Sequence, residues 1–320
     1  MRPESTSAIL RPDLTAVAQE YDAEKAATKF IGRRAAPIFN SPIYSTTYPV
    51  VKRENFVKRT EDGRAPDGSY NRITGEWGTG TFTCQDHGIE YPIDDERRRR
   101  YSRYIDAESA ATRMLHFQAL LNHEYRVAAL YAGAGLTNHD VTTAWTTVAT
   151  AVPLADLRTG INTLSDACGA APAEISLIIP RTDFQEMLAC TTVNNKILYT
   201  YPGAQPAELT AQQVAAMLGI KEVLVARGAI DSTEEGVAVS MGQLWTAAVM
   251  YLAVLAGEND PLDAPSATRT IQWTEDSPEF PVIESYRDEK VRGDVLRERV
   301  NTDEVLTAEA DLMAYKITNT

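Results

Sequence analysis

The clearest periodic pattern in the sequence runs from Asp106 to Ala132. Apolar residues recur at three- and four-residue steps and form one helical stripe: Met114, Phe117, Leu121, Ala128 and Tyr131. This stretch contains no glycine or proline, Asp106 and Glu108 suit a helix N-terminus, and Gly133 can end the helix. We therefore predict one long helix that spans about 40 Å, at about 1.5 Å per residue.

A different pattern occupies residues 150–260, where short apolar runs alternate with amphipathic segments. Helices are predicted for Leu154–Cys168, "RTDFQEMLAC" and "TAQQVAAMLGI", and buried strands for "EISLIIP" and "KEVLVARGAI". We expect Thr182 and Thr210 to cap the second and third helices, and Gly219 to end the third. This order indicates a compact α/β subdomain.

The first hundred residues contain a short expected helix around Leu14–Phe30 and then a long extended segment. Residues 44–93 partly alternate apolar and polar positions at both ends, and the middle, "TEDGRAPDGSYNRITGEWGTG", is rich in Gly, Asp and Asn. We interpret this segment as a two-stranded excursion with a long loop. A hairpin of this size cannot bury both of its faces within its own subunit, so we expect it to lie on a neighbour.

The C-terminal segment, residues 261–320, alternates charged and apolar residues over several stretches, which predicts extended strands. No internal repeat or low-complexity tract occurs in the sequence. The whole chain therefore combines a long helix, an α/β subdomain and separate strands, an α+β organisation.

The composition is that of an ordinary folded protein, with 44% hydrophobic and 23% charged residues. A formal net charge of −13 argues against a dedicated DNA or RNA binder. Cys84, Cys168 and Cys190 are far apart and have no zinc-site spacing, which favours reduced thiols. The longest apolar run, Trp245–Leu255, is too short to cross a bilayer, so we expect a soluble, intracellular chain without a membrane partner.

One basic run interrupts this acidic chain. Three acids, Asp94, Asp95 and Glu96, precede four consecutive arginines: Arg97, Arg98, Arg99 and Arg100. Five arginines and five acids occur between Asp94 and Glu108, so the region is locally neutral. A strand would place the arginines on alternate faces and a helix would spread them around its axis, and neither makes one DNA-binding stripe. We expect ion pairs within and between subunits, with contact to nucleic-acid phosphates as a minor alternative.

Motifs that carry catalytic chemistry are absent from the sequence, including H-E-x-x-H, G-x-S-x-G and the phosphate-binding loop. His116 and His123 could share a face of the long helix, but a metal site needs a further ligand and Glu124 is expected to point elsewhere. We interpret both histidines as polar side chains on a helix surface. We therefore expect no enzyme, no cofactor and no metal site.

The order of these parts resembles the major capsid proteins of tailed bacteriophages, which have the Hong Kong 97-like fold. "KFIGRRAAPIFNSPIYSTTYPVVKRENF" is similar to the lead-in to the extended loop of that family, "GRAPDGSYNRI" to the loop tip, and "YPIDDERRRRYSRYIDAESAA" to the return strand and its junction with the spine helix. "EISLIIPRTDFQEMLACTTVNNKILYTYPG" followed by "ELTAQQVAAMLGIKEVLVARGAID" is similar to the axial-domain pattern. The resemblance covers nearly the whole chain, and its specificity lies in the order of the parts.

The resemblance implies five parts with defined places in the chain. These are an N-terminal arm (1–43), an extended loop (44–93), a peripheral domain with the spine helix (94–149), an axial domain (150–260) and peripheral C-terminal strands (261–320). It also implies a subunit of hexamers and pentamers that tile an icosahedral shell around packaged double-stranded DNA. Net negative charge suits such a shell, because a basic interior would hold the DNA and obstruct its packaging and ejection.

The resemblance further implies a location and partners. The subunit would belong to a virion capsid assembled in the host cytoplasm. Its expected partners are other copies of itself, a separate scaffolding protein, a portal, a decoration or cement protein, and packaged DNA through weak non-specific contact. The candidate contact residues between subunits are Lys52, Lys58, Arg64 and Trp77 in the extended loop, with Asp94, Asp95, Glu96, Arg97, Arg98, Arg99 and Arg100 at its junction with the spine helix.

Other functions remain open at this point. An encapsulin or a gene-transfer-agent shell protein would share the fold. An α/β enzyme with an unrecognised site belongs to a different class, and the sequence offers no candidate residues for it. A tail or other phage structural protein is a further alternative, against which the spine helix and the α/β subdomain argue.

Overall fold

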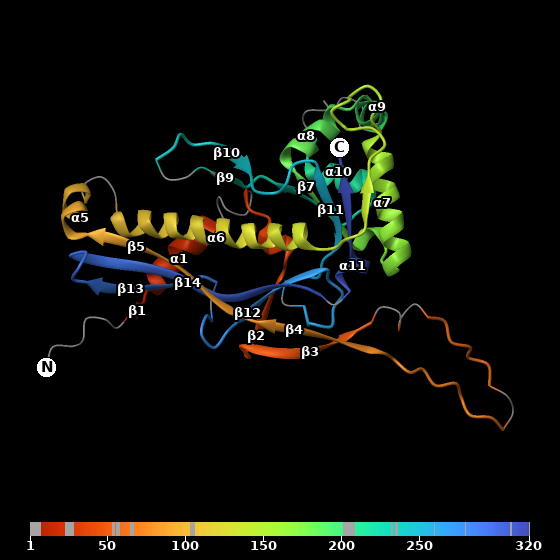
Figure 1. The fold of residues 1–320 in the computed structure, drawn as a ribbon, viewed down its shortest axis with the longest axis horizontal. Helices are drawn as coiled ribbons and strands as arrows, with labels where there is room; N and C mark the ends of the chain where they lie inside the picture. Colours follow the sequence, from red (N-terminus) through yellow and green to blue (C-terminus); the bar gives the residue numbers. More distant parts are fainter. Residues whose placement is uncertain are drawn as a thin grey trace.

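The computed structural model describes residues 8–22, 29–52, 55, 58–64, 67–102, 106–200, 209–231, 233, 236–258, 260–278, 280–307 and 309–319. A long helix, α6, lies along a six-stranded sheet, and a five-stranded sheet with its own helices stands at one end of α6 (Figure 1). Mixed helices and sheets confirm the predicted α+β class.

Helix α6 spans Ala107–Gly133, within one residue of the predicted bounds. The Asp106 side chain accepts a hydrogen bond from the backbone N–H of Glu108 and caps the helix. The buried face, however, differs from the predicted apolar stripe. Met114 is 56% exposed, whereas His116 and Glu124 are fully buried, because α6 turns these polar side chains towards partners on neighbouring elements.

The six-stranded sheet has the order β1-β13-β14-β12-β2, and β5 pairs with the other edge of β14. Its strands are β1 (Ile9–Leu10), β2 (Ile38–Ser41), β5 (Gln85–Asp94), β12 (Thr268–Trp273), β13 (Val282–Asp288) and β14 (Gly293–Leu306). The predicted C-terminal strands are confirmed for β12, β13 and β14. Gly293 lies so close to β5 that a Cβ atom would stand 2.1 Å from the Ile93 carbonyl oxygen, so only glycine fits there.

The extended segment is a shorter excursion than predicted. Strands β3 (Ser45–Val51) and β4 (Trp77–Thr83) form an antiparallel pair, and the chain between them projects away from the body (Figure 1). Residues 85–94, expected to belong to the excursion, form β5 inside the six-stranded sheet. The excursion therefore ends at Thr83, whose backbone N–H donates to the Asp303 carboxylate at 2.8 Å and anchors the hairpin to β14.

The five-stranded sheet has the order β6-β15-β11-β7-β8. Its strands are β6 (Asn138–Asp140), β7 (Ile175–Pro180), β8 (Glu222–Ala226), β11 (Val249–Val254) and β15 (Ala314–Thr318). β15 comes from the C-terminal segment that was expected to lie with the peripheral strands, and β6 precedes residue 150. The sequence boundaries are corrected accordingly, because backbone pairing with β11 places β15 in this sheet.

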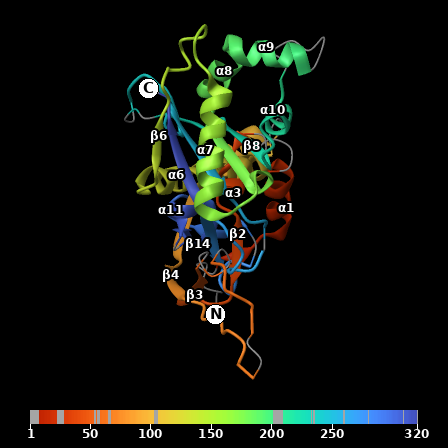
Figure 2. The same cartoon turned by 90° about the vertical axis from the view of Figure 1, so that its right-hand side faces the viewer.

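Helices α7 (Pro153–Cys168), α8 (Arg181–Ala189) and α10 (Ala211–Leu218) pack against this sheet, and α9 (Thr191–Thr200) packs on α7 and α8 (Figure 2). Thr210 caps α10 as predicted, and Gly219 ends it with a left-handed φ of +75°. Thr182 is not a cap, because α8 already begins at Arg181 after Pro180. The helices and strands predicted for this part are otherwise confirmed.

The N-terminal segment packs on the long helix. Helix α1 (Pro12–Tyr21) contacts α6 and β13, and the short α3 (Gly32–Ala35) also contacts α6. The predicted helix around Leu14–Phe30 is confirmed only as far as Tyr21, and residues 23–28 lie outside the described part.

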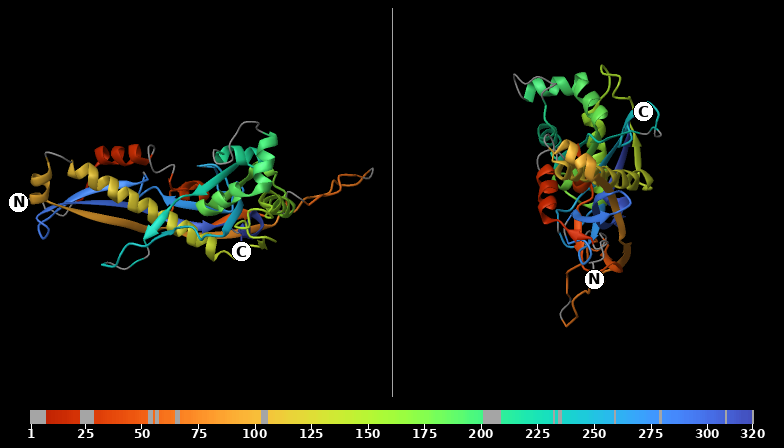
Figure 3. Two further views of the ribbon diagram at one scale, coloured as in Figure 1. Left: turned by 90° about the horizontal axis from the view of Figure 1, so that it is seen from above. Right: turned by 90° about the vertical axis from the view of Figure 1, so that its left-hand side faces the viewer.

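The remaining elements are short, and one of them, a single 3-10 turn at Pro172–Glu174, directly precedes β7. Helix α5 (Asp95–Tyr101) precedes α6, strands β9 (Ala229–Asp231) and β10 (Met241–Gln243) form a small hairpin, and α11 (Ala310–Met313) precedes β15. Seen from above, α5 and the projecting loop lie at opposite ends of the molecule (Figure 3). In the described part of the chain, no helix combines the length and the apolar character that crossing a membrane requires.

Candidate contact sites between subunits

The base of the projecting loop, between β3 and β4, is held by a few polar contacts. Lys52 Nζ lies 2.9 Å from the Glu76 carboxylate. The Asn55 side chain donates to the Glu76 carbonyl oxygen at 2.7 Å and accepts from the Glu76 backbone N–H at 2.9 Å. These contacts close the loop just beyond the β3–β4 ladder, so the residues past this point extend from a defined base.

The loop, and the start of β4 at its base, expose large apolar side chains. Tyr70 is 70% exposed, Ile73 74%, and Trp77, at the start of β4, 65%. The Arg64 guanidinium lies over the Tyr70 ring at 5.0 Å, and Lys58 contributes positive charge near Glu76. Apolar side chains gathered on a projecting segment without a core of its own mark a surface that another molecule would cover.

The four arginines at the far end of the molecule lie on helix α5. The Asp94 side chain accepts from the Glu96 backbone N–H at 2.6 Å and caps the helix. The helical alternative is therefore the one observed. Four consecutive helical positions cover every direction around the axis, so Arg97, Arg98, Arg99 and Arg100 make no single basic stripe.

Two of these arginines are paired within the subunit. Arg98 lies 2.9 Å from the Asp294 carboxylate and also pairs with Glu108 on α6. Arg100 lies 2.6 Å from Glu96, one helical turn earlier. Arg98 therefore ties α5 to both β14 and α6.

The Arg98 contacts belong to a larger ion-pair network. Arg287 on β13 binds Asp95 through two hydrogen bonds of 2.9 and 2.5 Å and reaches Asp294 at 3.3 Å. The Arg287 guanidinium holds the pKa of the Asp95 carboxyl below its ordinary value. Sequence reasoning missed Arg287 and Asp294, because nothing local in the sequence shows that β13 and β14 would bring them to α5.

Arg97 and Arg99 differ from their neighbours. Within the part of the chain that the structure describes, neither forms an ion pair. Arg97 instead lines a groove between α5, α6 and β5, beside Ile93 and the exposed Met114. Of the four arginines, these two are the ones without an ion pair among the described residues, so we take them as the candidates for contact with another subunit.

The two histidines of α6 are buried and not on the surface as predicted. His116 Nδ1 lies 2.9 Å from the Glu298 carboxylate, and His123 Nε2 lies 3.2 Å from Thr270 Oγ1 and 3.7 Å from Glu304. Burial lowers the pKa of His123 to about 4. The Glu298 and Glu304 carboxylates on β14 thus give the two imidazoles polar partners, without which their burial would be costly. Among the described residues no group of three metal-ligating side chains comes together.

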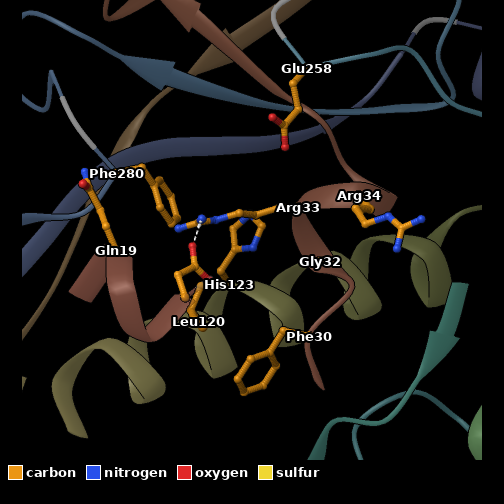
Figure 4. A pocket seen from close by; sticks show the side chains of 10 residues that line it. Gln19, Phe30, Gly32, Arg33, Arg34, Leu120, His123, Glu258 and Phe280 are labelled. Atoms are coloured by element: carbon orange, nitrogen blue, oxygen red, sulfur yellow. Dashed lines mark hydrogen bonds and ion pairs between the residues drawn. The ribbon is translucent and has the colours of Figure 1, made fainter. Parts of the chain in front are cut away.

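A cavity of about 380 Å³ lies between α1, α3 and α6 (Figure 4). Arg33 crosses it, pairs with Asp22 and stacks on the Phe280 ring, with 4.1 Å from its guanidinium carbon to the ring centroid. Burial lowers the pKa of Arg33. The stacked and paired guanidinium holds α1 to the segment before β13, which is a packing role.

No protein-family model and no curated protein sequence matches this chain. Solved structures do match it over nearly its whole length. A phage-related protein from Bordetella bronchiseptica RB50 has a TM-score of 0.72 at 17% identity, covering 98% of each chain. The capsid structure of the cyanophage P-SCSP1u has a TM-score of 0.58 at 11% identity, covering 91% of this chain and 88% of that one. The capsid of a native GTA (gene-transfer agent) particle has a TM-score of 0.54 at 11% identity, covering 99% and 94%.

Proposed function

We propose that this chain, which has the Hong Kong 97-like fold of the tailed-phage major capsid proteins, is a shell subunit with a structural and not an enzymatic role. The observation that carries the proposal is the match to a cyanophage capsid and a GTA capsid, and to a phage-related protein, over most of the chain. Surface chemistry supports it, because Tyr70 and Ile73 on the projecting loop, and Trp77 at the start of β4, are large apolar side chains that a single subunit leaves uncovered.

The finer proposal is that copies join head to tail into hexamers and pentamers of a closed shell. The projecting loop and the α5 arginines lie at opposite ends of the molecule (Figure 3), so contacts made by them join different surfaces of two copies. Contacts between different surfaces generate rings when the rotation closes. The loop residues Lys58, Arg64 and Trp77 and the junction residues Arg97 and Arg99 are our candidates for these contacts.

The proposed location is the capsid of a virion assembled in the host cytoplasm, around double-stranded DNA. A net charge of −13 would keep the wall from gripping the packaged DNA. A separate scaffolding protein, a portal and a decoration protein are the proposed partners besides the chain itself.

The direct test is assembly of the purified full-length chain. We expect light scattering to report particles much larger than a 35.2 kDa subunit, and negative-stain microscopy to show shells or capsomer rings. Because a scaffold is a proposed partner, the chain is also to be co-expressed with the scaffold candidate encoded beside it. A persistent monomer under all salt conditions, with and without that partner, would refute the proposal.

The role of the projecting loop is tested by shortening it. Replacing residues 59–74 with a short glycine-serine linker retains the Lys52–Glu76 and Asn55–Glu76 contacts at the base of the loop. We expect a folded subunit with unchanged circular dichroism that no longer forms stable shells. The double substitution Tyr70→Ser and Ile73→Ser is the milder variant, with assembly reduced and not abolished. Normal shells from both variants would remove the bridging role from the loop.

A gene-transfer-agent shell is the second candidate, and the match to a GTA capsid favours it specifically. The two functions differ in what the particle contains. Sequencing DNA from purified particles gives one discrete viral genome for a phage head and random host segments for a gene-transfer agent. Particles filled with protein and free of DNA would indicate an encapsulin instead.

A further inference from the structure

We propose that Glu258 closes onto Arg33 and acts as a latch between the β11–β12 connection and the N-terminal helices α1 and α3. The structure shows the open arrangement of this latch. The inference concerns the inside of a single subunit, so it goes beyond the proposed shell function and does not depend on it.

The guanidinium of Arg33 has one edge paired and one edge unpaired. Nη1 pairs with the carboxylate of Asp22, directly after α1, and the guanidinium stacks on the Phe280 ring. Nε and Nη2 are buried and have no hydrogen-bond partner among the described residues. These two groups form the edge that holds a carboxylate through two parallel hydrogen bonds. Buried donors without an acceptor are costly, so the structure leaves a place for one more carboxylate.

Glu258 is the carboxylate best placed to fill that position. It lines the same cavity as Arg33, and Figure 4 shows its carboxylate directed toward the guanidinium. Glu258 is exposed and forms no hydrogen bond or ion pair within the described part of the chain. Its negative charge already opposes the lowering of the Arg33 pKa that burial causes.

Glu298 on β14 is the other acid whose charge acts on Arg33 without pairing with it, but Glu298 is held in place. Its Oε1 lies 2.9 Å from Nδ1 of His116, and the residue is 2% exposed. Moving this carboxylate to Arg33 would break a buried pair inside the six-stranded sheet, whereas Glu258 gives up only its contact with solvent. The observations therefore favour Glu258.

The turn that carries Glu258 is anchored. The backbone N–H of Gly257 donates to the Asp260 carboxylate at 2.6 Å, and the Arg269 guanidinium donates to the carbonyl oxygens of Asp260 at 3.3 Å and Pro261 at 3.1 Å. Arg269 lies on β12 and is 1% exposed, so these bonds tie the turn to the six-stranded sheet. Closure is therefore a rotation of the Glu258 side chain into the cavity of about 380 Å³ and not a displacement of the whole connection.

The unpaired edge of Arg33 would also suit a small anion such as phosphate. Asp22 and Glu258 both act on Arg33 with negative charge, so a further anion would be repelled by both. Glu258 is already attached beside the cavity, so its binding costs no translational freedom. We therefore assign the unpaired edge to Glu258 and use phosphate only as a probe.

A closed latch joins parts of the subunit that are far apart in the sequence. Strand β11 belongs to the five-stranded sheet and β12 to the six-stranded sheet, so Glu258 lies in a connection between the two sheets. Arg33 lies on α3, which contacts α6. Closure thus adds a charged link that restrains this connection against α1 and α3.

Hydrogen exchange of the full-length protein, followed by mass spectrometry, tests the latch. Glu258→Gln keeps the size of the side chain and removes its charge, and we expect amide exchange in residues 255–258 and 32–35 to become about fivefold faster. Glu289→Gln, an exposed acid on the β13–β14 turn, is the matched control and should leave both segments unchanged. Circular dichroism and light scattering verify that all variants share one fold and one assembly state.

A second background tests the pairing with Arg33. Arg33→Lys keeps a positive charge beside Asp22 but removes the edge that holds a second carboxylate. We expect Glu258→Gln to have no further effect on exchange in this variant. An equal effect in both backgrounds would show that Glu258 acts elsewhere and would overturn the latch.

Three other outcomes overturn the latch as well. The first is exchange that Glu258→Gln leaves unchanged. The second is slower exchange of wild type in added phosphate, which would assign the Arg33 edge to a free anion. The third is protection that is lost only in Glu298→Gln, which would assign the edge to Glu298. None of these results depends on assembly, so each leaves the proposed shell function standing.

Discussion

Trp245 Nε1 donates a hydrogen bond of 2.9 Å to Oε1 of Glu124, and both residues are buried. The other carboxylate oxygen, Oε2, accepts the backbone N–H of Ile31 at 2.8 Å. One side chain of α6 thus joins the segment before α3 to the loop that leads into β11. Burial raises the pKa of the Glu124 carboxyl to about 7, although both hydrogen bonds oppose this rise.

This contact predicts a pH dependence of stability. The unfolded-state pKa of a glutamate is about 4.3, below the folded-state value, so folding favours the protonated form of Glu124. Its contribution is greatest below pH 4, falls as the pH rises towards 7, and is constant above that. Between pH 5 and pH 8 we expect a loss of about 2–3 kcal/mol from this group, at about 1.4 kcal/mol per pH unit. Urea unfolding of the unassembled subunit measures it.

The matched control for that prediction is Glu124→Gln. Glutamine has one acceptor oxygen for two donors, so we expect the variant to be less stable at pH 5 by about 1–3 kcal/mol. It cannot ionise, so the difference in unfolding free energy between wild type and variant should shrink as the pH rises. A difference that stays constant from pH 5 to pH 8 would show that Glu124 does not titrate in this range.

The buried His116–Glu298 pair predicts strong coupling between its two members. His116→Leu leaves the Glu298 carboxyl buried without that partner, and Glu298→Leu does the same to the imidazole, so each should cost about 3 kcal/mol or more. The double variant replaces both groups with apolar side chains of similar volume. We expect it to be at least about 1.5 kcal/mol more stable than the sum of the single losses predicts.

A double-mutant cycle by urea unfolding measures this coupling. Leu157→Ala, in the core of the part around the five-stranded sheet, serves as the distant partner, and its effect should add to that of His116→Leu within about 0.5 kcal/mol. Additivity for the His116–Glu298 pair as well would mean that the two groups do not depend on each other.

Among the α5 arginines, we expect those with ion pairs inside the subunit to affect its stability and those without to affect assembly. Arg98→Gln removes ion pairs to Asp294 and Glu108 that are partly exposed, so we expect the subunit to lose about 1 kcal/mol of stability. Arg97→Gln with Arg99→Gln should change subunit stability by less than about 0.5 kcal/mol. We expect this second variant to assemble less well, as judged by the fraction of protein in sedimenting particles. Normal assembly by it would remove both arginines from the proposed interface.

The cysteines should be chemically silent in the folded subunit. Burial raises the pKa of Cys84 to about 11 and also raises that of Cys190. At pH 8 only about 0.1% of a thiol with that pKa is ionised, against about a quarter of an ordinary cysteine with a pKa near 8.5. We expect labelling of Cys84 by a disulfide reagent to be at least about a hundredfold slower than in urea. Rapid labelling in buffer would contradict the buried position of Cys84.

Local sequence patterns predicted most of the individual elements. Helices α6, α7 and α10 and strands β7 and β8 follow from apolar periodicity, and the Thr210 cap and the Gly219 stop mark α10 from sequence alone. Each of these features depends on residues close together in the chain. The buried face of α6 was predicted incorrectly because a search for apolar periodicity treats His116, His123 and Glu124 as polar and assigns them to the exposed face. The carboxylates that contact these two buried histidines lie on β14, almost 200 residues away in the sequence.

Long-range pairing also decided which candidate residues the structure brings together. The run from Arg97 to Arg100 was visible as a charge pattern, but its division into paired and available arginines depends on Asp294 and Glu108. Asp294 reaches α5 because β14 pairs with β5 across about 200 residues of sequence. The same limitation explains why β5 was assigned to the excursion and β15 to the wrong sheet.

Strand β15 lies between β6 and β11, inside the five-stranded sheet. During synthesis β6, β7, β8 and β11 are made before residues 314–318. Until β15 follows, the sheet lacks the strand that separates β6 from β11. Helix α7 packs against both β15 and β11 of that sheet. A chain that has not yet placed β15 would thus leave the facing edges of β6 and β11 without their backbone partner.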